Sequence, residues 1–292
     1  MRHVVILPYF CDEEIKRYLK IVDRMQQFPK QNCDWQFLLA ASPRIKPSDE
    51  LRSACEKLAP TDSFQCPTQI FGYPEGPTAM FWDSMQYIQD NTPDDGGFGF
   101  WFESDMAATQ PDWMDRLDAE WRGEKELPLL MGLYVPEVYK QRLLKKRKLL
   151  LGDHVNGGAC YGKQFAGLMP PEARDGVFDV VVYEYAKQLG KVKPTGLIDF
   201  STNQRVRRDI LNTDKVVLHG FMQDKNKFID DCVAPVTERE RKKAYLHPMI
   251  DSIESTRRKL RVWSVRRGKQ AMYENMLLAK DRDNKRLSLI HI

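Results

Sequence analysis

Short apolar runs alternate with amphipathic stretches along the first 135 residues of the chain. Unbroken apolar runs are typical of strands buried on both faces, and apolar positions three or four residues apart indicate helices that pack on a sheet. The predicted strands are residues 4–7, 35–40, 69–71, 98–102 and 129–135. The predicted helices are residues 12–26, 48–58, 78–89 and 113–121. This alternation predicts an α/β fold in which a mostly parallel central sheet is flanked by helices.

The pattern is less regular after residue 135. Residues 137–151 are basic and leucine-rich and predict either a helix or a loop, whereas 179–189 predicts a helix and 215–218 a short strand. The last fifty residues have the pattern of one or two long helices. We therefore expect one domain over residues 1–235 and a basic helical extension over residues 236–292.

The charge distribution supports this division. The chain holds 45 Lys and Arg against 41 Asp and Glu, and its net charge of +4 does not by itself indicate nucleic-acid binding. Residues 238–288 hold 15 basic and 7 acidic side chains, so the rest of the chain carries a net charge of −4. The extension would pack as a helical appendage, contact an anionic membrane surface, or serve an oligomer or a polyanion site.

Cysteine spacing bears on the compartment. The six cysteines form no CxxC pair and have no histidine partners at zinc-site spacing, which favours free thiols in a reducing compartment. No apolar run reaches the roughly 18–20 residues that a membrane-spanning helix needs, and residues 4–10 are too short for a signal peptide. We expect a cytoplasmic protein, with peripheral membrane contact as an option.

Two carboxylates follow the most apolar predicted strand. Glu103 and Asp105 come directly after residues 98–102, with one residue between them. Ligands of open α/β sheets bind at the carboxyl ends of strands, and two carboxylates at this spacing can reach one cation. Oxygen ligands suit Mg²⁺ or Mn²⁺, which commonly bridge substrate phosphates. The alternative is a turn with two solvated acids.

A histidine and a lysine later in the chain extend this candidate site. His219 follows the apolar run 216–218 and would complete a metal site with Asp105, a mixed ligand set that favours Mn²⁺ over Mg²⁺. Lys225 lies just beyond and would meet a diphosphate. The alternative for His219 is local hydrogen bonding at a strand end.

Two glycine-containing segments complete the candidate chemistry. Gly157 and Gly158 permit close backbone approach, so this segment could form one wall of a sugar pocket with polar groups from His154 and Asn156. The alternative is a tight turn entering a strand. Residues 72–78 form a loop that opens a helix, where anions are attracted, although P-loop and GxGxxG spacing are both absent.

These pieces, in this order over roughly residues 1–230, resemble the GT-A family of nucleotide-sugar-dependent glycosyltransferases, whose fold is Rossmann-like. Glu103-Ser104-Asp105 resembles the DxD metal motif of the family in an ExD form. The family's nucleotide pocket, acceptor-side strand and late metal-site histidine are matched by further positions: Pro8, Tyr9, Ser42, Gly72 and Gly76; Asn156, Gly157, Gly158 and Tyr161; and His219 followed by Lys225.

The resemblance implies a metal-dependent enzyme that moves a hexose from a UDP- or GDP-sugar to a hydroxyl group of a glycan, lipid-linked or protein acceptor. Asp105, Glu103 and His219 would hold the metal, and Lys225 would add positive charge at the diphosphate. Glu103 departs from the family's usual aspartate, and no ExD base motif follows Gly158. Asp179 is the acid nominated as catalytic base for an inverting course, whereas a retaining course needs no such base.

Two other functions compete with this interpretation. A sugar-phosphate nucleotidylyltransferase has a similar core, but it normally carries a glycine-rich, arginine-containing loop after the first strand, where this chain has residues 8–12 without glycine or arginine. A non-catalytic interaction protein could keep the same fold and use the basic extension to bind a partner.

Overall fold

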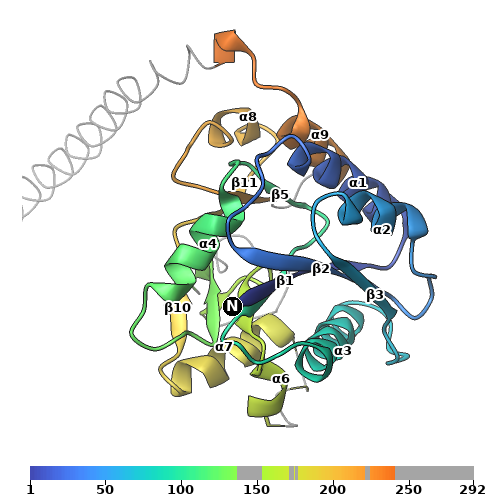
Figure 1. Ribbon diagram of the computed structural model, residues 1–292, viewed down its shortest axis with the longest axis vertical. Helices are drawn as coiled ribbons and strands as arrows, with labels where there is room; N and C mark the ends of the chain where they lie inside the picture. The colour runs from blue at the N-terminus through green and yellow to red at the C-terminus, as the bar shows by residue number, and fades with distance from the viewer. Residues whose placement is uncertain (137–152, 171–173, 175–176, 221–223, 241–292) are drawn as a thin grey trace, which may run out of the picture. The chain divides into compact units, whose positions relative to one another are not determined.

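The computed structural model describes residues 1–136, 153–170, 174, 177–220 and 224–240 (Figure 1). The chain divides into two compact units, Met1–Pro235 and Val236–Ile292. Only residues 236–240 of the second unit are described. The predictions for the basic stretch 137–151 and for helices in the last fifty residues fall almost wholly outside the described residues.

A seven-stranded sheet forms the centre of the first unit, in the order β10-β6-β9-β4-β1-β2-β3. Strand β9 runs antiparallel to both of its neighbours, and all other neighbours in this sheet are parallel. The strands are β1 (Arg2–Tyr9), β2 (Asp34–Ala41), β3 (Thr61–Gln65), β4 (Phe98–Trp101), β6 (Leu130–Gly132), β9 (Cys160–Gly162) and β10 (Val192–Pro194). The predicted α/β class with a mostly parallel central sheet is therefore confirmed.

Two smaller sheets lie beside the central one. One has the order β11-β12-β5, in which β12 is parallel to β11 and antiparallel to β5. The other pairs β7 with β8. Their strands are β5 (Met106–Ala108), β7 (Tyr134–Val135), β8 (His154–Val155), β11 (Ile198–Ser201) and β12 (Val217–Gly220).

Helices cover both faces of the central sheet (Figure 1). One face packs on α3, α6 and α7 through an aromatic cluster that includes Phe81, Tyr161 and Phe178. The other face packs on α4 through contacts such as Phe98 with Trp121. The helices are α1 (Asp12–Met25), α2 (Asp49–Glu56), α3 (Glu75–Asn91), α4 (Trp113–Arg122), α6 (Phe165–Leu168), α7 (Phe178–Gln188), α8 (Val206–Asp209) and α9 (Lys225–Val233).

Two predicted strands are wrong in detail. Residues 69–71 are not a strand, and Ile70 is 47% exposed. The third strand is instead β3, which pairs with β2 at the edge of the sheet and therefore tolerates polar side chains along its length. The predicted strand 129–135 is two strands, because the chain leaves the central sheet after β6 and pairs with β8 as β7.

Two further observations concern the cysteine thiols and the length of the helices. All six cysteines are free thiols, as predicted. Within the described ranges, no helix combines the length and the apolar character needed to cross a membrane.

Candidate active site

The candidate site is built at the carboxyl ends of β1, β2 and β4. These strands are parallel, so their ends meet at one edge of the sheet. The hydroxyl group of Tyr18, on α1, lies 3.0 Å from the Pro8 carbonyl and 2.8 Å from the Phe102 carbonyl. One buried side chain thus ties the end of β1 to the segment that follows β4.

A tight turn places the two acids of the motif. After β4, the amide of Met106 donates to the Glu103 carbonyl at 2.9 Å, and the chain then enters β5. Strand β5 pairs with β12, where His219 lies opposite Met106 and the Gly220 amide donates to the Asp105 carbonyl at 2.8 Å. This pairing brings His219 to the motif although more than a hundred residues separate them.

The three predicted metal ligands come together in the structure. The Nε2 atom of His219 lies 3.3 Å from Asp105 Oδ1 and 3.4 Å from Glu103 Oε2. One ligand atom from each residue lies within 4.8 Å of the others. The other ring nitrogen, Nδ1, lies 2.8 Å from Asn156 Oδ1, a contact that orients the ring with Nε2 toward the acids.

Asp105 is the most deeply buried of the two acids. It is 4% exposed, and its Oδ1 atom makes no hydrogen bond within the described residues. Its Oδ2 atom lies 2.7 Å from Lys225 Nζ, at the first residue of α9. The two carboxylates and the imidazole form a ligand set that fits a divalent cation. The buried Oδ1 atom of Asp105, which makes no hydrogen bond within the described residues, is the oxygen that such a cation would satisfy.

The charges at this site shift the pKa values of Asp105, His219 and Lys225. Burial alone would lower the pKa of His219, but its interactions with Asp105 and Glu103 outweigh burial and raise that pKa to about 10. Burial would raise the pKa of Asp105, yet the positive charges of His219 and Lys225 hold it well below its usual range. Asp105 is therefore ionised at neutral pH, as metal binding requires, whereas His219 is protonated and would release a proton when a cation binds its Nε2 atom.

Gly157 and Gly158 bring a backbone wall up to the motif. A Cβ atom on Gly157 would lie 3.0 Å from Glu103 Oε1, and one on Gly158 would lie 2.5 Å from Met106 Sδ. A side chain at residue 157 would press on Glu103, and one at residue 158 would press on Met106, which directly follows the motif. Tyr161 is fully buried, and its hydroxyl group donates to the Gly157 carbonyl at 2.9 Å, which places this tyrosine behind the wall.

Asp179, the nominated base, lies beside His154, which is on the strand that leads into the Gly157–Gly158 segment. Asp179, in the first turn of α7, has Oδ2 3.8 Å from His154 Nε2, and His154 is buried. Burial raises the pKa of Tyr73, and the negative charges of Asp179 and Glu103 raise it further. The exposed Tyr73 therefore lies within electrostatic range of both acids, a proximity that the sequence pattern did not reveal.

The remaining predicted positions lie at the ends of β1 and β2 and around the start of α3. Tyr9 is buried and its hydroxyl group accepts from the Ser48 amide at 3.1 Å, while the Ser42 amide donates to the Tyr9 carbonyl at 2.8 Å. Gly72 adopts a φ of +88°, which favours glycine, and its carbonyl accepts from the Gly76 amide. Helix α3 begins at Glu75, three residues before the predicted start.

Sequence reasoning missed two charged side chains of α1. Glu14 and Arg17 are both buried, and both contact Ser104, the middle residue of the motif. The available signal was their position, because both fall on the apolar face of the helix with Tyr18, Ile21 and Met25.

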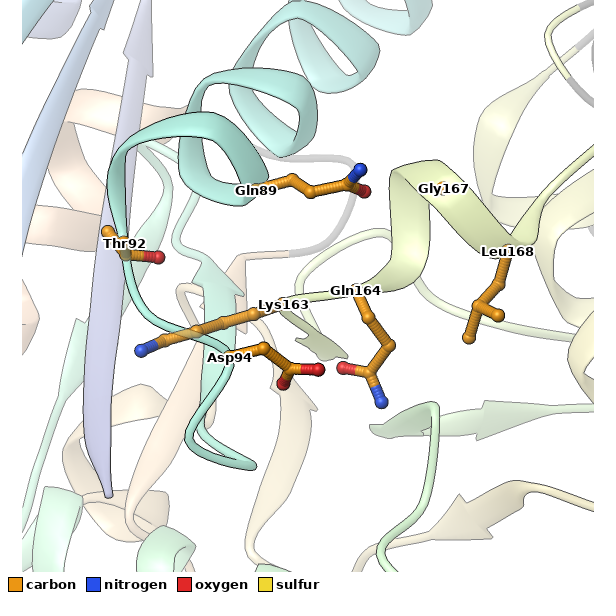
Figure 2. Close-up of a pocket in the computed structure, with 7 residues that line it drawn as sticks. All are labelled: Gln89, Thr92, Asp94, Lys163, Gln164, Gly167 and Leu168. Atoms are coloured by element: carbon orange, nitrogen blue, oxygen red, sulfur yellow. The ribbon is translucent and has the colours of Figure 1, made fainter.

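A separate cavity of about 260 Å³ lies at the opposite end of the sheet (Figure 2). It is lined by Gln89, Thr92, Asp94, Lys163, Gln164, Gly167 and Leu168. The ammonium group of Lys163 binds the Pro93 carbonyl at 3.1 Å and Asp95 at 2.9 Å, so this lysine ties two loops together. None of the predicted site residues lines this cavity.

Comparisons with known proteins concern the fold. No protein-family model matches the sequence, and no curated protein matches it. The galactosyltransferase LgtC, solved with donor and acceptor sugar analogues, is 11% identical with a TM-score of 0.48, over 82% of this chain and 99% of LgtC. Glucosyl-3-phosphoglycerate synthase from Mycobacterium tuberculosis is 16% identical with a TM-score of 0.42, over 66% and 68% of the two chains.

A third similar structure is mouse xyloside xylosyltransferase 1, which is 6% identical with a TM-score of 0.44, over 76% of this chain and 98% of that chain. By name, LgtC and the mouse enzyme are glycosyltransferases.

Proposed function

We propose that the protein transfers a hexose from a nucleoside diphosphate sugar, with UDP or GDP as the nucleotide, to an acceptor hydroxyl group. The observation that supports this most directly is the meeting of Glu103, Asp105 and His219 at the carboxyl edge of the sheet. Lys225 adds a positive charge 2.7 Å from Asp105. The acids would hold a cation, and this cation together with the lysine would offer positive charge to a diphosphate group.

Asp105, Glu103 and His219 would hold a divalent cation, and the imidazole ligand favours Mn²⁺ over Mg²⁺. When bound, such an ion supplies positive charge that offsets the negative charge developing on the diphosphate leaving group. Asn156 holds the His219 ring in orientation, and Lys225, which pairs with Asp105 from the start of α9, would turn toward phosphate oxygens once a cation binds Asp105. The absence of side chains at residues 157 and 158 lets this backbone segment pack directly against Glu103 and Met106.

Asp179 is our nominee for the acceptor side. Its carboxylate is partly buried beside His154 and lies in electrostatic range of Tyr73. In an inverting reaction it would accept the proton of the acceptor hydroxyl group. A glycan, a lipid-linked sugar and a protein side chain all remain candidate acceptors, and the six free thiols favour a reducing compartment such as the cytoplasm.

The test is the substitution Asp105→Asn, which keeps the shape of the side chain and removes its charge. We expect the wild-type protein to bind Mn²⁺, to bind UDP or GDP in its presence, and to hydrolyse a UDP- or GDP-sugar slowly without acceptor. Asp105→Asn should weaken Mn²⁺ binding at least about 10-fold to 100-fold, the range typical of damage to a metal site. Isothermal titration with Mn²⁺, followed by a donor-hydrolysis screen, measures both effects.

The matched control is Asp94→Asn, which removes an exposed carboxylate at the opposite end of the sheet and should change neither quantity. Unchanged Mn²⁺ and nucleotide affinity in a folded Asp105→Asn protein would contradict the metal assignment. Failure of the wild-type protein to bind either ligand would favour a non-catalytic interaction protein.

A further inference from the structure

One guanidinium group on α1 contacts both segments that bring charge to the candidate site. Arg17 donates from Nε and Nη2 to Ser104 Oγ, at 3.3 Å and 3.0 Å. It also donates from Nη1 to Asn226 Oδ1 at 3.2 Å. Ser104 lies between Glu103 and Asp105, and Asn226 directly follows Lys225. Arg17 therefore joins the acidic motif to the segment that carries the lysine.

The geometry of the turn explains why Ser104 is the point of attachment. Glu103 and Asp105 both face His219, whereas the side chain between them, Ser104, is 3% exposed and contacts α1. The contacts of Ser104 with α1 therefore restrict the backbone that carries the carboxylates of Glu103 and Asp105.

Glu14 completes this attachment. Ser104 Oγ donates to Glu14 Oε1 at 3.0 Å, and Glu14 Oε2 accepts from the Phe10 amide at 2.9 Å. Glu14 Oε1 also lies 3.6 Å from Arg17 Nη2. The serine hydroxyl group thus uses its proton and its lone pairs within a buried network, which restricts it to one orientation.

We propose that Arg17 is a positioning residue that sets the spacing between the metal-binding carboxylates and Lys225. This inference rests on the proposed function, because it explains the spacing between a bound metal ion and the lysine that would contact the diphosphate. The two arms of the arginine act separately: the arm to Ser104 supports the metal ligands, and the arm to Asn226 supports the first turn of α9 and its lysine.

Each set of hydrogen bonds made by Arg17 can be removed by a substitution in its partner, and the buried charge of Arg17 then stays paired with Glu14. Ser104→Ala removes the arm to the motif, and Asn226→Ala removes the arm to α9, while the Arg17–Glu14 pair remains in both variants. Arg17→Lys keeps the positive charge beside Glu14 but lacks the planar fork that reaches both partners. Lys20→Met is the matched control, because the Lys20–Asp230 ion pair also joins α1 to α9 and is exposed, away from the motif.

The experiment is isothermal titration of the full chain, first with Mn²⁺ alone and then with UDP and with GDP at saturating Mn²⁺. We expect Ser104→Ala to bind Mn²⁺ about 10-fold more weakly, the lower end of the effects seen when a residue supporting a metal ligand is removed. Asn226→Ala should not weaken Mn²⁺ binding, and should weaken nucleotide binding about 3-fold to 10-fold, the size expected for the loss of one hydrogen bond. Arg17→Lys should weaken both, and Lys20→Met should weaken neither.

Thermal unfolding separates positioning from general support of the fold. All four variants must be folded at the titration temperature, and a structural role alone would lower their melting temperatures without changing the ligand affinities. The inference is overturned if Ser104→Ala and Asn226→Ala keep wild-type affinities, or if Lys20→Met alters them equally. Failure of the wild-type protein to bind Mn²⁺ and nucleotide overturns the proposed function itself, which is a different result.

Discussion

At the scale of single residues, the carboxylate of Asp105 is shared between two positive side chains. Oδ2 lies 2.7 Å from Lys225 Nζ, and Oδ1 lies 3.3 Å from the ring of His219. The attraction is mutual, because burial would lower the pKa of Lys225 while Asp105 raises it above its usual value. Lys225 therefore competes with any divalent cation for Asp105, although under the proposed function it would also contact the diphosphate.

This dual role predicts effects of opposite sign for Lys225→Met. Mn²⁺ binding without nucleotide should become several-fold tighter, because a competing charge is gone. UDP or GDP binding at saturating Mn²⁺ should become about 10-fold weaker, corresponding to about 1.4 kcal/mol of lost attraction. Isothermal titration measures both affinities. Lys227→Met is the control, since Lys227 pairs with Asp231 on the same helix and should affect neither. A loss of Mn²⁺ affinity in Lys225→Met would refute the competition.

At the scale of elements, the sequence predicted those whose apolar pattern is long enough to be distinctive. The buried strands β1 and β4 and the helix α1 were found because their patterns extend over several residues. Strand β3 was missed, because an edge strand carries polar residues, and the apolar residues 69–71 were mistaken for it.

The candidate site shows the same limit. Its residues were identified separately, but the strand pairing that unites them was not predicted. Strand β5 has three residues, too few for a periodic signal, and its antiparallel pairing with β12 brings His219 to Asp105. The contacts of Arg17 with residues 104 and 226 also depend on tertiary packing, which no local pattern encodes.

A prediction at this scale concerns the packing of β1 on α4. His3 is fully buried, with Nε2 2.7 Å from Asp118 Oδ1, and its Nδ1 accepts from the Phe98 amide. Burial lowers the pKa of His3 despite the opposing attraction of Asp118. The folded protein therefore holds a neutral ring, which the unfolded chain protonates as the pH falls below about 6.5.

The free energy of unfolding should then decrease with falling pH below about 6.5, by up to about 1.4 kcal/mol per pH unit from this residue. Above that pH both states hold a neutral ring, so His3 contributes no slope. Urea denaturation between pH 7.5 and 5.0 measures the effect, with His3→Gln as the comparison that cannot titrate. Equal slopes for the two proteins in this range would show that His3 is not kept neutral by the fold.

At the scale of the whole molecule, charge and chemistry lie in different parts of the chain. Every residue assigned to the candidate site belongs to Met1–Pro235, whereas the basic excess lies in residues 238–288. The net charge of +4 is thus the sum of a slightly acidic unit and a basic extension. We propose that donor binding requires only the first unit, and that the extension serves the acceptor or another partner.

A chain ending at Glu240 tests this division. The end point keeps the Ala234 and Pro235 carbonyls that accept from Arg207, and the bonds between Thr237 and Glu240. Because no site residue is removed, we expect Mn²⁺ affinity and nucleotide affinity within about twofold of the full chain, a difference below about 0.5 kcal/mol. Asp105→Asn in the shortened chain is the control and should again weaken Mn²⁺ binding about 10-fold or more. A loss of about 10-fold or more in a folded shortened chain would mean that residues 241–292 contribute directly to the donor site, and the two units would then have to be treated as one functional body.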